Sequence, residues 1–208
     1  MTVSVRVHRF RSPAVPARWT TIALFAFAVA ALGHAAVHAW RMGSGRPHAT
    51  TAATIDRLVA ATAPLALVAF VGWFHRVYGN LRALGTPPRH ATGWAIACWL
   101  VPFLQLYRPM QLMRELWRAA DAGSHLRVAL WWAASLLFLF SASLAGRRSP
   151  SWPFTVDDPS HLPMLEILAA DTLAAVAAVL AGSLVHRVTT AQLATNEAQR
   201  SQARAATC

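Results

Sequence analysis

The sequence predicts an all-α polytopic integral membrane helix bundle with four spans, a proline-broken re-entrant segment and an amphipathic interfacial helix. The first observation is composition, because 56% of the 208 residues are hydrophobic and only 13% are charged. A soluble domain carries about 25% charged residues. The mean hydropathy is +0.39. The second observation is the presence of four long apolar segments in a chain whose length suits a single domain.

The four apolar segments are each close to the ~20 residues that a helix needs to cross the hydrocarbon core of a bilayer. They are expected at residues 20–40, 57–78, 128–145 and 163–185. Pro64 lies inside the second, which membrane helices tolerate when neighbouring groups satisfy the freed carbonyl. For the first segment, a cleaved signal peptide remains an alternative.

Two polar tails flank the expected membrane domain of residues 20–187. Residues 1–19 contain arginines and no acidic residue, and are expected to form a basic cytoplasmic tail. Residues 188–208 are rich in Gln and Ala, and the sequence leaves open whether they extend the last helix or are disordered.

Residues 93–108 form the broken segment, because its apolar part is too short for a full span and Pro102 interrupts it. We expect it to enter the membrane and return to the same side. Residues 109–120 follow as an amphipathic helix, with Met110, Met113, Leu116, Trp117 and Ala120 on one face. Such a helix lies along the membrane interface.

The distribution of arginine favours this topology. With a re-entrant segment, 14 arginines lie on the side of both termini and five on the other, whereas a full crossing gives nine and ten. The positive-inside rule therefore predicts a multi-pass membrane protein with both termini cytoplasmic. Asp157 and Asp158 then face outward.

Two stretches, WFHRVYGNLRALG from Trp73 and GWAIACWLVPFLQLYRPMQLMRELW from Gly93, carry a spaced pattern of tryptophan, glycine, proline and charged residues. This pattern resembles the bacterial membrane-protein family catalogued as domain of unknown function 4328. Thr92 and Gln105 depart from it, standing where a proline and an asparagine are expected. The resemblance implies an integral protein of the bacterial cytoplasmic (inner) membrane and assigns no activity.

Six polar residues form the candidate binding cluster: Arg76, Asn80, Gln105, Arg108, Glu115 and Asp171. Arg76 is expected to bind an anionic headgroup or pair with Glu115, and Asn80 to hydrogen-bond the backbone exposed by Pro102. The alternative is a snorkelling arginine and a helix-ending asparagine. Gln105 could satisfy the carbonyl of Cys98.

Asp171 lies deep in the last span, where an acid is costly unless it is neutral or paired. A hydrogen bond to Thr62 or Ser135 is the structural alternative.

A metal site is a weaker possibility, formed by His34 and His38, which lie one helical turn apart, with Glu166. A haem held by His75 and His186 has less support. The sequence therefore assigns neither a metal nor a cofactor.

The leading functional hypothesis is a non-enzymatic membrane module that binds lipid headgroups, especially anionic ones, or a protein partner or a second copy of itself. The alternative is a small transporter or channel that uses Asp171. No serine, cysteine or aspartate arrangement resembles a hydrolase, and the two cysteines form no CxxC motif, so an enzyme is not expected. The net charge of +11 is explained by topology, and nucleic acid is not an expected partner.

Overall fold

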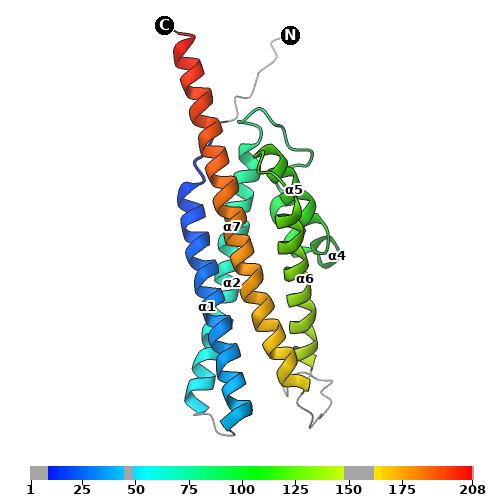
Figure 1. Cartoon of the computed structure of the whole chain (residues 1–208). Helices are drawn as coiled ribbons and strands as arrows, with labels where there is room; N and C mark the ends of the chain where they lie inside the picture. Colours follow the sequence, from blue (N-terminus) through cyan, green and yellow to red (C-terminus); the bar gives the residue numbers. More distant parts are fainter. Residues whose placement is uncertain (1–8, 45–48, 148–161, 208) are drawn as a thin grey trace. The chain divides into compact units, whose positions relative to one another are not determined.

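The computed structural model describes residues 9–44, 49–147 and 162–207, and these residues form helices and no strand (Figure 1). The helices are α1 (Ala14–Ser44), α2 (Ala49–Asn80), α3 (Trp94–Leu100), α4 (Pro102–Gln105), α5 (Arg108–Ala119), α6 (Leu126–Arg147) and α7 (Leu162–Ala205). The predicted all-helical class is confirmed. Four of the helices are long and apolar enough to cross a membrane, namely Ala14–Trp40, Ala53–Asn80, Leu126–Leu144 and Leu165–Ala205.

The long helices extend beyond the predicted spans. α1 begins at Ala14, because Pro13 precedes the helix and Pro16 lies in its first turn, where proline costs no hydrogen bond. α7 runs for 44 residues and includes most of the C-terminal segment whose conformation the sequence left open. The residues Arg6, Asp157, Asp158 and Cys208, which enter the predicted topology and tails, lie outside the described part of the chain.

Contacts divide the chain into two compact units, and each long helix contributes to both. The first unit comprises Met1–Thr21, Val68–Val128 and Ser183–Cys208. The second unit comprises Ile22–Leu67 and Ala129–Gly182.

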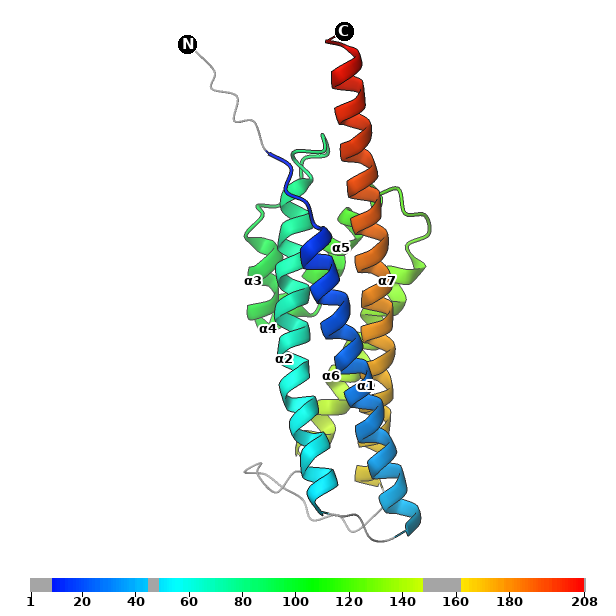
Figure 2. The same ribbon diagram turned by 90° about the vertical axis from the view of Figure 1, so that its left-hand side faces the viewer.

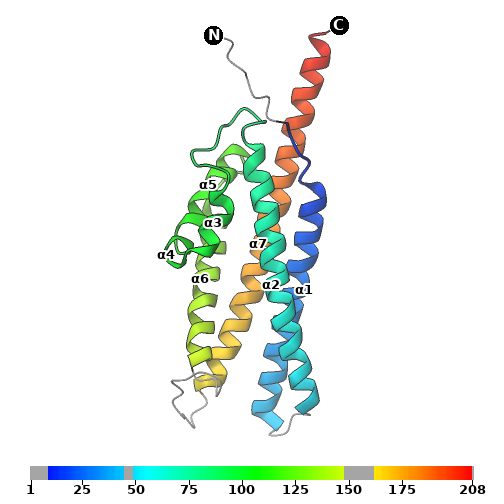
Figure 3. The same cartoon turned by 180° about the vertical axis from the view of Figure 1, so that it is seen from behind.

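The first unit contains the broken segment. α3 ends at Leu100, Val101 is extended with φ −101° and ψ 114°, and α4 begins at Pro102. This is the conformation that a proline imposes on the residue before it. α3, α4 and α5 contact one another and form a group beside the end of α2 (Figures 2 and 3). The predicted interruption at Pro102 is therefore present.

Aromatic side chains make the core of the first unit. Trp73, Phe74 and Tyr78 of α2 are fully buried, and Trp117 of α5 is 1% exposed. The buried face of α5 also contains Leu112, which was not expected there. Met110 and Ala120, which were placed on that face, are only half-buried. The indole N–H of Trp117 donates to the carbonyls of Gly123 and Ser124, which fixes the turn after α5.

Small residues make the core of the second unit. α7 buries a stripe of alanines at positions 170, 174, 177, 178 and 181. Such stripes allow membrane helices to approach closely. Gly33 of α1 serves the same purpose, because a Cβ there would lie 3.1 Å from Cδ1 of Ile55 in α2.

Candidate functional site

Asn80, the last residue of α2, is the centre of a buried polar network in the first unit. Its Nδ2 donates to the backbone carbonyl of Arg11 at 2.8 Å, and its Oδ1 accepts from the backbone N–H of Arg11 at 3.1 Å. Its Nδ2 also donates to Oε1 of Gln192 at 3.1 Å. Asn80 thus ties the segment before α1 to the end of α2 and to the C-terminal half of α7. It does not bond the backbone near Pro102, so that predicted contact is wrong.

Gln192 of α7 extends the network, and it is only 4% exposed. Its Nε2 donates to the carbonyl of Val77 at 2.8 Å. The last carbonyls of a helix lack partners within the helix, so this bond satisfies a group that would otherwise be orphaned. One turn earlier, Thr189 accepts from the indole N–H of Trp73 at 3.0 Å. Gln192 was not predicted as a site residue, because it lies in a polar segment that resembles a solvated tail.

Glu115 of α5 holds the loop that follows α2. Its Oε2 accepts from the hydroxyl of Tyr78 at 2.9 Å, and its Oε1 accepts from the backbone N–H of Arg89 at 2.6 Å. The predicted pairing with Arg76 is absent, and the carboxylate binds these two donors instead. Arg76 is half-buried, and among the described residues it has no hydrogen bond or ion pair.

Arg108 begins α5 and is surrounded by aromatic and polar groups. Its guanidinium carbon lies 5.7 Å from the ring centroid of Trp94 and 5.6 Å from that of Tyr107, within cation–π range. Its Nη1 donates to Gln111 Oε1 at 3.1 Å and lies 3.3 Å from His90 Nε2. The side chain of Gln105 is half-buried and, within the described ranges, bonds no carbonyl, so the predicted contact with Cys98 is absent.

The thiol of Cys98 in α3 is completely buried. Burial raises the pKa of this thiol to about 11, although the nearby charge of Arg108 opposes the shift. A buried thiol with a raised pKa is a poor nucleophile at neutral pH.

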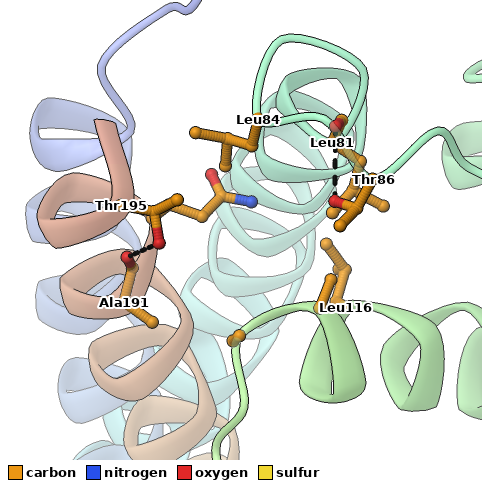
Figure 4. A pocket seen from close by; sticks show the side chains of 9 residues that line it. Leu81, Leu84, Thr86, Leu116, Ala191 and Thr195 are labelled. Atoms are coloured by element: carbon orange, nitrogen blue, oxygen red, sulfur yellow. Dashed lines mark hydrogen bonds between the residues drawn. The ribbon is translucent and has the colours of Figure 1, made fainter. Parts of the chain in front are cut away.

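A small cavity of about 60 Å³ lies between the loop that follows α2, the end of α5 and the C-terminal half of α7 in the first unit (Figure 4). Apolar side chains such as Leu81, Leu84 and Leu116 form most of its wall, with Thr86 and Thr195 beside them. This volume suits about two water molecules, so the cavity does not fit an organic ligand.

Asp171, the sixth predicted site residue, belongs to the second unit and forms a cluster with histidines. Its Oδ2 lies 2.6 Å from Nδ1 of His34. On the other side of the same ring, Nε2 of His34 lies 3.0 Å from Asp56 Oδ1 and 3.1 Å from Nε2 of His38. The cluster joins α1, α2 and α7.

The sequence analysis missed Asp56 and considered Glu166 in its place. The sequence did contain a signal for Asp56. Counted in residues, His34 and Asp56 lie at similar distances from the loop that joins α1 and α2, and therefore at similar depths in the two helices. The hydroxyls considered as partners of Asp171 bond within their own helices, Thr62 to the carbonyl of Leu58 and Ser135 to that of Trp131.

Charge is divided unequally between the units. By sequence, the first unit holds 14 arginines and three acidic residues, so its net charge is +11. The second unit holds five arginines and five acidic residues, and its net charge is zero. The whole net charge of the chain therefore lies in the first unit.

The four long apolar helices define the class of protein: a helical membrane protein of the polytopic kind. Its family follows from comparison with known proteins, because the family model described as Domain of unknown function (DUF4328) matches residues 38–190. The chain belongs to this family, as the resemblance indicated. No curated protein and no solved structure matches it.

Proposed function

We propose that the protein is a non-enzymatic module of the bacterial cytoplasmic membrane, and that its first unit binds anionic lipid headgroups. The observation that carries this proposal is the division of charge, with +11 in the first unit and zero in the second. Each arginine near an anionic membrane surface contributes about 1 kcal/mol of attraction. The same charge asymmetry supports a topology with both termini in the cytoplasm.

Exposed side chains around α4 support contact with lipid. Leu100 is 76% exposed and Phe103 is 81% exposed, on either side of the break at Pro102. Arg108 lies a few residues further along, against the rings of Trp94 and Tyr107. Tryptophan, tyrosine and arginine are typical of the headgroup region, and apolar side chains beyond them favour the hydrocarbon. This arrangement supports a re-entrant segment that dips into one leaflet.

Arg76 and Arg114 support headgroup recognition on the same unit. Both are half-buried, and neither has a hydrogen bond or ion pair within the described part of the chain. The Nε of Arg114 is a buried donor without an acceptor there. Since a buried unsatisfied donor is costly, a lipid phosphate that reached these arginines would remove that cost.

The proposal is tested by lipid retention. We would purify the full chain in a neutral detergent and add phosphatidylglycerol or phosphatidylcholine. Native mass spectrometry then compares the lipid adducts that survive activation. A variant with Arg82, Arg89, Arg114 and Arg118 changed to Gln should lose its preference for phosphatidylglycerol.

The matched control removes four arginines from the second unit instead, namely Arg41, Arg46, Arg57 and Arg148. This control should keep the wild-type preference. Equal retention of phosphatidylglycerol by the first variant and the wild type would overturn the headgroup proposal. A protein partner or a second copy would then be the remaining occupant, and a shift in mass on size-exclusion chromatography would identify it.

A small transporter or channel is the second candidate, and the buried pair of Asp171 and His34 favours it. Intramembrane ionisable residues often line ion or proton pathways. Flux assays in reconstituted vesicles with Asp171→Asn address this candidate. Unchanged flux of every tested ion or solute would remove its support.

A further inference from the structure

We propose that His34, His38 and Asp56 bind a divalent transition-metal ion of the zinc class, and that Asp171 orients His34 for this role. The site lies within the second unit and is independent of the headgroup proposal, which concerns the first unit.

The first argument is convergence of ligand atoms. One ligand atom from each of His34, His38 and Asp56 lies within 4.8 Å of the other two. Zinc binds imidazole nitrogen and carboxylate oxygen at about 2.0–2.2 Å, so neighbouring ligands of a tetrahedral ion are about 3.3 Å apart. The observed separations of 3.0 Å and 3.1 Å from Nε2 of His34 are close to this value.

The second argument is the count of donors and acceptors around His34. A neutral imidazole has one N–H and one lone pair. If Nδ1 donates to Asp171 at 2.6 Å, the lone pair of Nε2 faces the carboxylate oxygen of Asp56 at 3.0 Å. Two acceptors at that distance repel each other unless a cation, either a proton on Nε2 or a metal ion, lies between them. A proton on Nε2 would satisfy Asp56 alone, whereas a metal ion engages Nε2 of His34, Nε2 of His38 and the carboxylate of Asp56 together.

The third argument is the position of Asp171. Metal-binding histidines commonly donate their second ring N–H to a carboxylate, which fixes the tautomer and the orientation of the ring. Asp171 is 11% exposed at its side chain and meets His34 on the ring edge opposite Asp56. This is the geometry expected of a supporting carboxylate rather than a fourth ligand.

The fourth argument is charge. Two carboxylates in a membrane helix bundle are costly when uncompensated. A divalent ion with Asp56, Asp171 and two neutral imidazoles gives a neutral cluster. Nitrogen ligands favour zinc and related transition metals over magnesium and calcium, which prefer oxygen.

Access and fit also support the site. Asp56 is 55% exposed at its side chain, so an ion can reach the cluster and a coordination position remains for water. Gly33 and Ile55, the neighbours of the ligands in sequence, form the close approach of α1 to α2. That approach brings Asp56 within reach of His34.

The test uses the full chain, purified without a histidine tag and stripped with chelator. Zn²⁺ is titrated by calorimetry, and Co²⁺ by its visible absorption, which reports the coordination geometry. We expect one ion per chain, displaced neither by Mg²⁺ nor by Ca²⁺.

Asp56→Asn is the main variant, because its exposed side chain can change without disturbing folding, and His38→Gln is the second. Both should lose more affinity than Asp171→Asn, which should bind about 10- to 100-fold more weakly with unchanged stoichiometry. The controls His75→Gln and Asp121→Asn, exposed residues of the first unit, should bind as the wild type does. Metal uptake by Asp56→Asn and His38→Gln equal to that of the wild type would overturn the proposal. So would a wild-type protein that binds neither ion.

Discussion

Asn80→Ala is the sharpest test of the polar network in the first unit. The substitution removes the bond to Gln192, which contributes about 1 kcal/mol, and leaves the buried Oε1 of Gln192 without its donor, which costs about 1 kcal/mol more. It also removes two bonds to the backbone of Arg11, which contribute about 0.5 kcal/mol each because Arg11 is exposed. The expected loss is about 3 kcal/mol of unfolding free energy.

Two measurements follow the change. Denaturant unfolding in micelles, detected by tryptophan fluorescence, reports the free energy. Trypsin cleavage after Arg11 reports the local effect, because the peptide of Arg11 is held by Asn80 on both its N–H and its carbonyl. Loss of about 1 kcal/mol there should accelerate cleavage by about fivefold where opening is a rapid pre-equilibrium.

The matched control is Asn196→Ala on α7, a half-buried asparagine whose side chain makes no hydrogen bond within the described residues. It should leave both readouts close to the wild-type values. If Asn80→Ala unfolds at the same denaturant concentration as this control and Arg11 is cleaved no faster, the network does not hold the unit together.

Three further outcomes are expected. Thr189→Val should destabilise the protein by about 1–3 kcal/mol in the same unfolding assay, because it leaves the buried indole N–H of Trp73 without an acceptor. An unfolding midpoint equal to that of the wild type would contradict this prediction. Glu115→Ala should accelerate tryptic cleavage after Arg89, because it removes the carboxylate that accepts from the backbone N–H of Arg89. An unchanged rate of cleavage would mean that other contacts hold the loop after α2. In a Cys208→Ser variant, Cys98 should react with a maleimide at pH 8 only after unfolding, because burial raises the pKa of its thiol to about 11. Rapid labelling of this native variant would refute the burial of Cys98.

The sequence predicted the helices well because their signal is local. An apolar stretch of about 20 residues needs no knowledge of its neighbours, and a proline interrupts a helix wherever it packs. The helical class, the four candidate spans and the break at Pro102 all follow from such signals.

The partners within each site could not be predicted in the same way, because they join residues far apart in the chain. Asn80 was selected as a polar residue of interest, yet its partners Arg11 and Gln192 lie in segments that resemble tails. A segment that is polar on average gives no sign that one of its glutamines is buried. Likewise, Asp171 was selected for its depth, whereas its contact with His34 depends on how α1 and α7 pack.

The polar side chains of α7 have a consequence for its rotation. Thr189, Gln192 and Gln199 lie at spacings of three and seven residues, so they share one face of the helix, and they bond Trp73, Val77 and Leu84 respectively. A helix that met its neighbour only through alanines could slide or turn at little cost. Here a turn by one residue, about 100°, would break all three bonds together. These three bonds therefore fix the rotation of the C-terminal half of α7 about its own axis.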